Sequence, residues 1–416
     1  MTSCTTDTYH ETLECGIELA VRPMPHRHVV SFQIMVLSGY TSEPREKLGL
    51  GRLIGETIDK GTQKRSGREL LDAFDAIGAR HRVGTGRETT TLGCTVLGEH
   101  FERAVELQAE MLTQPTFEEE AFKVNVELAR QEISALEDDP QALLDKVMAP
   151  RVMGPLLGRH PLGKVETLDR LTRDDLVDQW KREFCGGRMI VAAAGPIEPQ
   201  RAADILQRNF EGFGRSERAG REPFKAEFEA GTAHLNKKLE QEQILIAYPG
   251  AATTDDDQPV QKVMLGVLSG GMSGRLFTEV REKQGLVYWV GAWQETPRGT
   301  GMIFLGASTK PERCQKTYET LLHEVDRLAK DIEPDELSRA ITGIVAGWET
   351  RGESTQAQCG ELANDLFHHG HPVPRDEKVR RIEAVSVDDI VLYLANHPRD
   401  RLCIHTLGPT PLSTDS

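Results

Sequence analysis

The sequence predicts an α+β protein built from two tandem homologous domains. Its 416 residues are more than one ordinary hydrophobic core accommodates. Two segments, which begin at His160 and His371, share a His-Pro start, a capped helix with Asp-Asp in its first turn, and a strand that ends in Gly-Pro. Such an internal repeat, with an offset of about 212 residues, indicates the duplication of one module. We therefore expect domains at 1–213 and 235–416, joined by a polar linker at 214–234.

Composition excludes several classes of protein. The chain is 38% hydrophobic and 28% charged, and no apolar run is long enough to span a membrane. A net charge of −15 argues against nucleic acid or an anionic membrane as a partner. The first residues lack the basic start and apolar core of a secretory signal, so we expect a cytoplasmic protein. Seven scattered cysteines with no Cys-x-x-Cys pair indicate reduced, mostly buried thiols.

The first half alternates strand and helix patterns. Apolar alternation predicts two strands within 12–38, with Pro23 and Pro25 at the turn between them. Ser66 followed by Glu69 is a capping-box pattern that opens a helix. The remaining expected elements are strands around 80–83 and 89–96, helices over 101–112, 116–137 and 141–153, a helix that starts at Thr172, and a buried strand at 189–195.

The second half contains one informative segment after a strand at 243–250. The glycine-rich stretch 270–274 opens a predicted helix that runs through Arg281, and Gly285 ends it. A strand with the sequence LVYWVGAW follows. Arg281 therefore lies near the end of the predicted helix and Tyr288 lies on the next strand, and we expect the two side chains to converge on one spot.

The stretch from 49 to 62, GLGRLIGETIDKGT, is predicted to form a short amphipathic helix because its apolar residues recur every three or four positions. Arg52 and Glu56 are four residues apart, so they project from the same face. Considered alone, they are a solvated ion pair worth a few tenths of a kcal/mol.

This stretch resembles the active-site helix of the pitrilysin/insulinase family of zinc peptidases, in which His-x-x-Glu-His is followed by Lys-Gly-Thr, here residues 60–62. In this resemblance, Arg52 and Glu56 replace the two zinc-binding histidines, Gly55 replaces the catalytic glutamate, and Glu132 stands at the third ligand. A permanently cationic arginine has no lone pair for zinc, and glycine supplies no general base. We expect no metal in this chain.

The degenerate site has a physical interpretation. Arg52 places a fixed positive charge where the metal would lie, and Glu56 and Glu132 are positioned to hold that charge. We expect this cluster to preserve the fold of the former site.

The resemblance covers nearly the whole chain and also implies a fold and a pair of substrate-binding residues. In the family, each half is an antiparallel sheet packed with helices, as in the processing peptidases. An Arg and a Tyr seven residues apart contact the substrate backbone and help to stabilise the reacting carbonyl; they correspond to Arg281 and Tyr288. A guanidinium and a phenol are both donors to a carbonyl oxygen, which agrees with this role.

The resemblance implies the non-catalytic, substrate-binding subunit of a heterodimeric zinc metallopeptidase that acts on peptides. The partner would be a homologous subunit that carries the zinc motif, and this chain would need no cofactor of its own. Two alternatives remain: a structural or assembly subunit, as in the core subunits of mitochondrial respiratory complex III, and an autonomous peptidase with an unusual site.

Three other motifs do not indicate a binding site. The glycines from Gly49 to Gly55 lack the strand-and-helix unit of a dinucleotide site. The histidines at 368, 369 and 371 are typical of a surface loop, and the aspartates at 255–257 are typical of a solvated loop or a helix cap.

Overall fold

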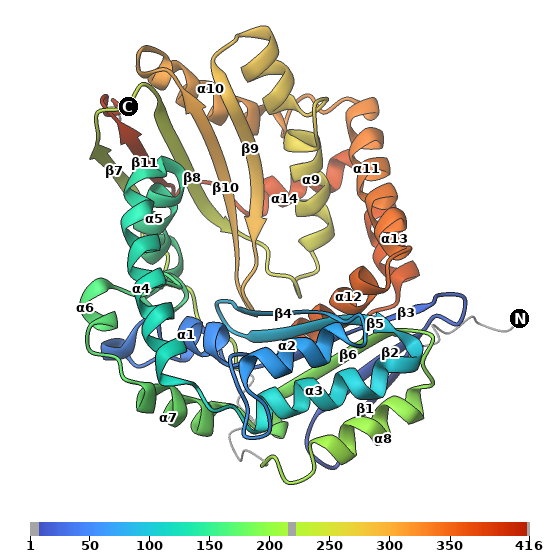
Figure 1. Cartoon of the computed structure of the whole chain (residues 1–416). Helices are drawn as coiled ribbons and strands as arrows, with labels where there is room; N and C mark the ends of the chain where they lie inside the picture. The colour runs from blue at the N-terminus through green and yellow to red at the C-terminus, as the bar shows by residue number, and fades with distance from the viewer. Residues whose placement is uncertain (1–7, 215–221, 414–416) are drawn as a thin grey trace, which may run out of the picture. The chain divides into compact units, whose positions relative to one another are not determined.

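The computed structural model describes residues 8–214 and 222–413, which form two compact units (Figure 1). Unit 1 contains the described residues of Met1–Ala135, Arg159–Glu222 and Thr350–Pro374. Unit 2 contains those of Leu136–Gly158, Pro223–Glu349 and Arg375–Ser416. Each unit therefore combines segments from both halves of the sequence.

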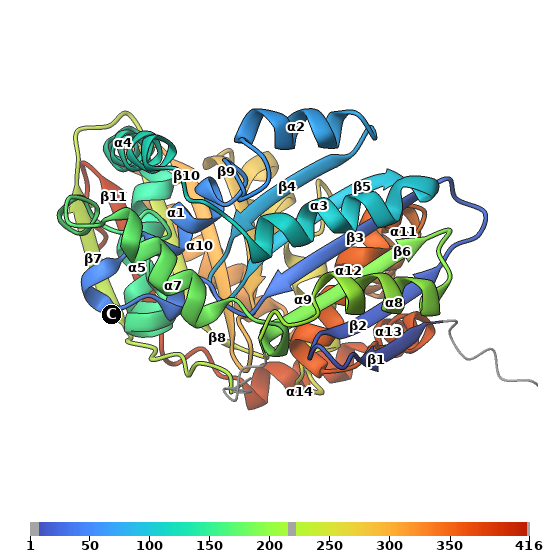
Figure 2. The ribbon, with the colours of Figure 1, turned by 60° about the horizontal axis from the view of Figure 1, so that its bottom comes forward.

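The sheet of unit 1 has the strand order β1-β2-β6-β3-β5-β4 (Figure 2). Its strands are β1 (Tyr9–Thr12), β2 (Glu18–Pro23), β3 (Val29–Val36), β4 (Arg80–Thr85), β5 (Thr90–Leu97) and β6 (Met189–Gly195). All neighbours are antiparallel except β2 and β6, which run parallel. The buried strand predicted at 189–195 is β6, and it lies in the middle of the sheet.

Helices cover both faces of this sheet. They are α1 (Leu50–Thr57), α2 (Gly67–Asp75), α3 (Phe101–Thr113), α4 (Glu119–Ala135), α6 (Val165–Leu168), α7 (Arg173–Glu183), α8 (Pro199–Asn209) and α12 (Thr355–His369). The main core contains residues of α1, α2, α3 and α8 together with one face of the strands. On the other face, Met35 and Ala192 pack with Leu362 and Leu366 of α12.

The sheet of unit 2 has the order β7-β11-β8-β10-β9. Its strands are β7 (Gly231–Asn236), β8 (Glu242–Gly250), β9 (Val287–Glu295), β10 (Gly301–Thr309) and β11 (Cys403–Gly408). Its helices are α5 (Pro140–Leu157), α9 (Gln258–Ser269), the π-helix η6 (Leu276–Lys283), α10 (Cys314–Arg327), α11 (Pro334–Gly352), α13 (Arg375–Glu383) and α14 (Val387–Asn396). Only β7 and β11 are parallel neighbours.

The two units follow one plan, in agreement with the predicted α+β duplication. In unit 1, β6 lies between β2, to which it is parallel, and β3, to which it is antiparallel. In unit 2, β11 lies in the same way between β7 and β8. Each sheet is antiparallel, as expected, except at one pair, since a strand that returns after a long crossover can pair in parallel.

The units exchange one helix. α5 follows α4 in the chain but packs on β8 and β11 of unit 2, whereas α12 packs on β2, β3 and β6 of unit 1. In unit 1, the Ser31 hydroxyl lies 2.9 Å from that of Thr355, and the Cys359 thiol donates to Ala192 O at 3.3 Å. The predicted domains at 1–213 and 235–416 did not include this exchange, and β7 begins inside the range predicted as a linker.

Local signals in the sequence fix several helix starts. Capping boxes join Ser66 to Glu69, Thr172 to Asp175 and Ser386 to Asp389, as the patterns predicted. Within residues 8–214 and 222–413, no helix is long and apolar enough to cross a membrane. The cysteines described there are free thiols, and all but Cys185 are buried.

Candidate functional site

Helix α1 of unit 1 begins at a buried carboxylate. Gly49 precedes the helix with φ +96°, a conformation that favours glycine. Glu43 accepts hydrogen bonds from the backbone N–H of Gly49 at 3.0 Å and of Gly51 at 2.6 Å, so it satisfies donors at the helix start. Burial raises the pKa of Glu43 to about 7, although these hydrogen bonds and the Arg159 guanidinium act in the opposite direction.

The structure brings Arg52, Glu56 and Glu132 together. Arg52 Nη2 donates to Glu132 Oε1 of α4 at 2.7 Å and lies 3.9 Å from Glu56 Oε1. Asn125 of α4 also donates to the backbone carbonyl of Glu56 at 3.0 Å, which ties the two helices together. The Arg52 side chain is 24% exposed and both carboxylates are about half exposed, so the cluster is partly solvated.

Gly55, which the resemblance aligns with a catalytic glutamate, has no room for a side chain. A Cβ there would lie 2.6 Å from Thr85 Oγ1 of β4. Thr85 is held in this place by its hydrogen bond to Gly51 O, at 3.0 Å. Sequence reasoning missed Thr85, because only the packing of β4 against α1 reveals it.

The residues at this place do not fit zinc. Arg52 would repel the ion and donates rather than accepts, and Gly55 carries no carboxylate. In the part of the chain that the structure describes, no group of three or more His, Cys, Asp or Glu side chains is arranged to hold a metal. We therefore derive no metal-dependent step for this chain.

Arg281 and Tyr288 lie in unit 2, on η6 and β9. The Arg281 guanidinium lies over the Phe277 ring, 5.0 Å from its centroid, and Tyr288 is 80% exposed. Among the described residues, neither side chain forms a hydrogen bond or an ion pair. Both remain available to an external carbonyl group.

The segment that carries Arg281 is a π-helix rather than the ordinary helix that the sequence predicted. Gly271 and Gly285, with φ +97° and +58°, flank it. Spacing alone does not distinguish a π-helix from an α-helix over two turns, since the two differ by one residue per hydrogen-bonded ring. π-Helical turns are frequent at functional sites.

A buried arginine anchors this π-helix. Arg275 is 3% exposed and donates to both carboxylate oxygens of Glu336, at 2.8 and 2.6 Å. It also donates to the carboxylate and the backbone carbonyl of Asp331, each at 2.8 Å. The guanidinium fixes the start of η6 to the connection between α10 and α11. No pattern in the sequence predicts this role.

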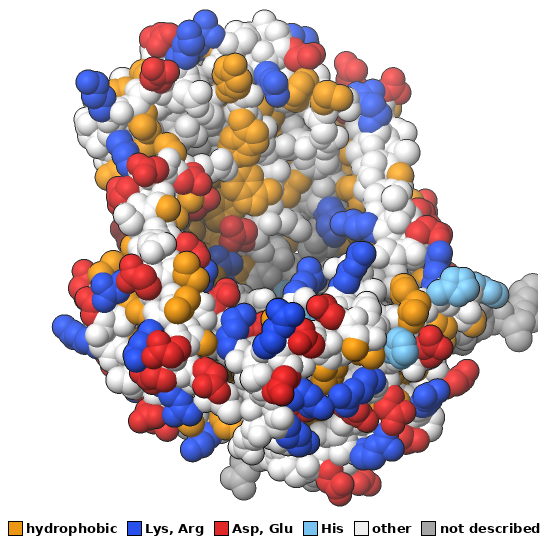
Figure 3. Space-filling view, in the orientation of Figure 1, with side chains coloured by type: hydrophobic (Ala, Val, Ile, Leu, Met, Phe, Trp, Pro, Cys, Tyr) orange, Lys and Arg blue, Asp and Glu red, His pale blue; other side chains and the backbone are white. Residues whose placement is uncertain are grey.

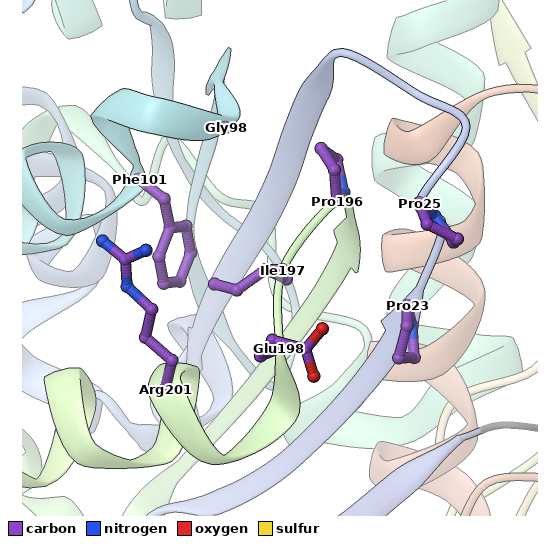
Figure 4. A pocket seen from close by; sticks show the side chains of 8 residues that line it. All are labelled: Pro23, Pro25, Gly98, Phe101, Pro196, Ile197, Glu198 and Arg201. Atoms are coloured by element: carbon purple, nitrogen blue, oxygen red, sulfur yellow. The ribbon is translucent and has the colours of Figure 1, made fainter.

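A shallow cavity in unit 1 does not belong to either cluster (Figure 4). Its volume is about 290 Å³, and prolines, Phe101 and Ile197 form most of its wall. Glu198 and Arg201 are its charged residues, and Figure 4 shows both on or just before α8. Of the residues singled out in the sequence, only the turn prolines Pro23 and Pro25 line it.

Sequence comparisons identify relatives over most of the chain. Residues 19–163 match the family model described as "Insulinase (Peptidase family M16)", and residues 170–344 match "Peptidase M16 inactive domain". An uncharacterized zinc protease of Streptomyces coelicolor is 28% identical over 411 residues, which cover 96% of this chain and 89% of that protein. A probable mitochondrial-processing peptidase subunit beta of Arabidopsis thaliana is 23% identical, with coverage of 97% and 78%.

A solved structure has the same fold. A protease from Helicobacter pylori superimposes with a TM-score of 0.90 and covers 97% of this chain and 100% of its own, at 18% identity. At that identity the likeness bears on the fold alone.

Proposed function

The chain belongs to the insulinase family of peptidases, and from this premise we propose that it is a non-catalytic, substrate-binding subunit of a heterodimeric zinc metallopeptidase that acts on peptides. The zinc site would lie in a homologous partner chain. One contrast supports the proposal: Arg52, which the resemblance aligns with the first zinc ligand, is ion-paired to Glu132, whereas Arg281 and Tyr288 are exposed and form no hydrogen bond or ion pair among the described residues.

The chemistry of this chain would be hydrogen-bond donation. The Arg281 guanidinium and the Tyr288 hydroxyl would donate to backbone carbonyl oxygens of a bound peptide, which positions the peptide and stabilises negative charge that develops on the reacting carbonyl. Arg275 would act as a positioning residue, since it holds the segment that carries Arg281.

Purification followed by mutagenesis tests the proposal. The tagged full-length chain is purified from its own source without chelator, and native mass spectrometry identifies any partner and its metal. The complex is then assembled with Arg281→Ala or Tyr288→Phe. We expect kcat/KM for peptide cleavage to fall about 100-fold for Arg281→Ala, as for the loss of one oxyanion donor, while the complex still forms.

Arg68→Ala is the matched control, because Arg68 is an exposed arginine on α2 with an 84% exposed side chain. It should leave cleavage unchanged. If the Arg281→Ala and Tyr288→Phe complexes assemble and cleave at the normal rate, the proposal fails and a structural or assembly role takes its place.

A further inference from the structure

A pocket of unit 1 gathers positive charge between α3, the end of α8 and the loop that precedes α2. We propose that this basic pocket binds a small phosphate monoester that also carries hydroxyl groups, such as a sugar phosphate. Neither Arg281 nor Tyr288 lines it, so the site is separate from the residues proposed to bind a peptide.

The size and charge of the basic pocket suit a small anion. Its volume is about 360 Å³, against about 290 Å³ for the cavity in Figure 4. Sites for small ligands begin at about 300 Å³. Two positive charges are in excess among its lining residues, although the whole chain has a net charge of −15. Its cations and carboxylates are Lys64, Arg65, Arg103, Arg208, Glu106 and Glu110.

A buried ion pair forms part of the pocket wall. The Arg65 guanidinium donates to Glu110 Oε2, and the Thr62 hydroxyl donates to Glu110 Oε1. The Glu110 side chain is only 6% exposed. Because both of its oxygens have donors within the protein, this carboxylate repels an incoming anion less than an unpaired one would.

The loop that carries Lys64 is fixed before any ligand binds. Thr62 Oγ1 accepts hydrogen bonds from the backbone N–H of Lys64 at 3.2 Å and of Arg65 at 3.0 Å. The backbone N–H of Gln63 donates to Gln114 O at 2.9 Å, which ties the loop to the end of α3. Groups that are already positioned lose less entropy when they bind a ligand.

Two side chains of the pocket have donors that the fold does not use. Among the described residues, the Lys64 ammonium forms no hydrogen bond or ion pair, and the side-chain amide of Gln114 forms no hydrogen bond. Lys64 is exposed and Gln114 is partly buried. An ammonium and an amide together offer five N–H groups to a ligand.

Two arginines add donors from the helices. Arg103 Nη1 donates to Glu106 at 2.7 Å, and Arg208 Nη2 donates to Glu102 at 2.5 Å. Glu102 also lies 3.7 Å from Arg201, so it is shared between two guanidinium groups. Each guanidinium has five N–H groups, so both arginines of the pocket keep donors for a ligand.

The selection of an anion depends on the pocket rather than on a uniformly basic surface. Figure 3 shows Lys and Arg side chains among Asp and Glu side chains over the part of the surface where α3 runs in Figure 1. Such a mixed surface attracts anions weakly at a distance. Charge-assisted hydrogen bonds inside the pocket would supply the affinity instead.

Phosphate fits the directions of these cations. They come from three elements: the loop before α2, α3 and the end of α8. A phosphate monoester has up to two negative charges and three terminal oxygens, which accept hydrogen bonds from several directions. A planar carboxylate offers two oxygens in one plane and a single charge. Arginine N–H groups also match phosphate oxygens in pairs.

The helix ends oppose an anion, but less strongly. The C-terminal ends of α3 and α8 lie at the pocket, and each carries roughly half a negative charge. Together they stay below the two excess positive charges. Donors within the protein reduce the effect at α3, since Trp180 Nε1 donates to Leu112 O at 2.8 Å and Gln63 N–H donates to Gln114 O.

The remaining polar groups select hydroxyls rather than a nucleobase. The Asn209 amide donates to Ile205 O at 2.8 Å, so its Oδ1 is left as an acceptor. The Thr113 hydroxyl donates to Ala109 O at 2.7 Å and keeps its lone pairs for a donor of the ligand. None of the described residues that line the pocket is aromatic, so a base would find no ring on which to stack.

Calorimetric titration of the full-length chain tests the ligand class. The probes are glucose 6-phosphate, inorganic phosphate, AMP and glucose, in a buffer of low ionic strength. We expect glucose 6-phosphate to bind about 10-fold more tightly than inorganic phosphate or AMP, and glucose to show no binding. Added salt should weaken the binding. Hydrogen exchange should slow at residues 62–66 and 110–114 when glucose 6-phosphate binds.

Neutral substitutions test the location. The double variant K64Q/R208Q should bind glucose 6-phosphate about 10-fold more weakly or worse, because it removes two charge-assisted donors. The matched control is R68Q/K123Q, which removes two exposed cations outside the pocket and changes the net charge equally. It should bind as the natural chain does. All four side chains are more than one-third exposed, so both variants should fold, and thermal unfolding checks this.

Four results would overturn the inference: no binding of glucose 6-phosphate, equal affinity for inorganic phosphate, tighter binding of AMP, or affinity that K64Q/R208Q leaves unchanged. Slowed exchange confined to other segments would place the ligand elsewhere and would also overturn it. The measurements need neither a partner chain nor zinc, so their outcome is independent of the cleavage test with Arg281→Ala.

Discussion

Arg52 and Arg281 stand on helices of the two units, but their surroundings differ. The Arg52 guanidinium donates to Glu132 at 2.7 Å and lies near Glu56, whereas Arg281 contacts the ring of Phe277. In unit 1, neighbouring carboxylates engage the arginine. In unit 2, the arginine remains available. A paired arginine contributes to its own fold, whereas an exposed arginine without an ion-pair partner is free to bind an external group.

The two helices also differ in their anchors. A buried carboxylate, Glu43, binds the start of α1, and a buried guanidinium, Arg275, binds the start of η6. Stability should therefore depend on Glu43 and Arg275, and much less on Arg52 and Arg281.

Replacement of Arg275 should have the largest effect on stability. Arg275→Met leaves Glu336 and Asp331 without their buried partner, and removal of one member of such a pair costs about 3 kcal/mol. Arg281→Met, the matched change on the same π-helix, should alter the free energy of unfolding by less than about 0.5 kcal/mol. Urea denaturation measures both. Equal effects would contradict the contrast between anchor and exposed arginine.

Glu43 should make stability depend on pH. Its pKa is raised from 4.5 to about 7 in the folded chain, so folding binds a proton between these values. The contribution of Glu43 to the free energy of unfolding is fully present below pH 4.5 and is lost as the pH rises to 7. Linkage gives a loss of about 3 kcal/mol over this window. The difference in unfolding free energy between the natural chain and Glu43→Gln should shrink accordingly; a constant difference would show that Glu43 does not titrate there.

Gly55→Ala should destabilise unit 1 by about 1 to 3 kcal/mol, because its Cβ would lie 2.6 Å from Thr85 Oγ1. The double variant Gly55→Ala, Thr85→Ala should recover part of this loss, since the second change removes the obstructing hydroxyl. Thermal unfolding of the two single variants and the double variant measures this coupling. Strictly additive losses would contradict the steric explanation.

The pair of Arg52 and Glu132 should contribute least. A double-mutant cycle with alanine should give a coupling of about 0.5 kcal/mol, because both side chains are partly solvated. The exposed pair of Arg68 and Asp72 on α2 is the control. A coupling well above about 2 kcal/mol would mean that Arg52 replaces the metal as a major structural centre.

Local chemistry in the sequence predicted much of this fold. The capping residues Ser66, Thr172 and Ser386 mark helix starts because the cap depends on residues only three apart. The internal repeat correctly indicated two copies of one plan. Strand β7 and the helix exchange were not predicted, because they depend on contacts between residues far apart in the chain.

The candidate site was predicted in part. The family resemblance identified Arg52, Glu56 and Glu132, and the structure places them together. Thr85 has no local signal because it acts on α1 from β4, and Glu43 lies six residues before Gly49, which is outside the three-residue spacing of a capping box.

The exchange of α5 and α12 has a consequence for what each half of the sequence encodes. Cys359 and Leu362 of α12, from the second half of the sequence, cover one face of the unit 1 sheet. Leu144 and Met148 of α5, from the first half, cover one face of the unit 2 sheet. Neither half of the sequence therefore encodes a complete unit, because one face of each sheet is covered by a helix that the other half supplies.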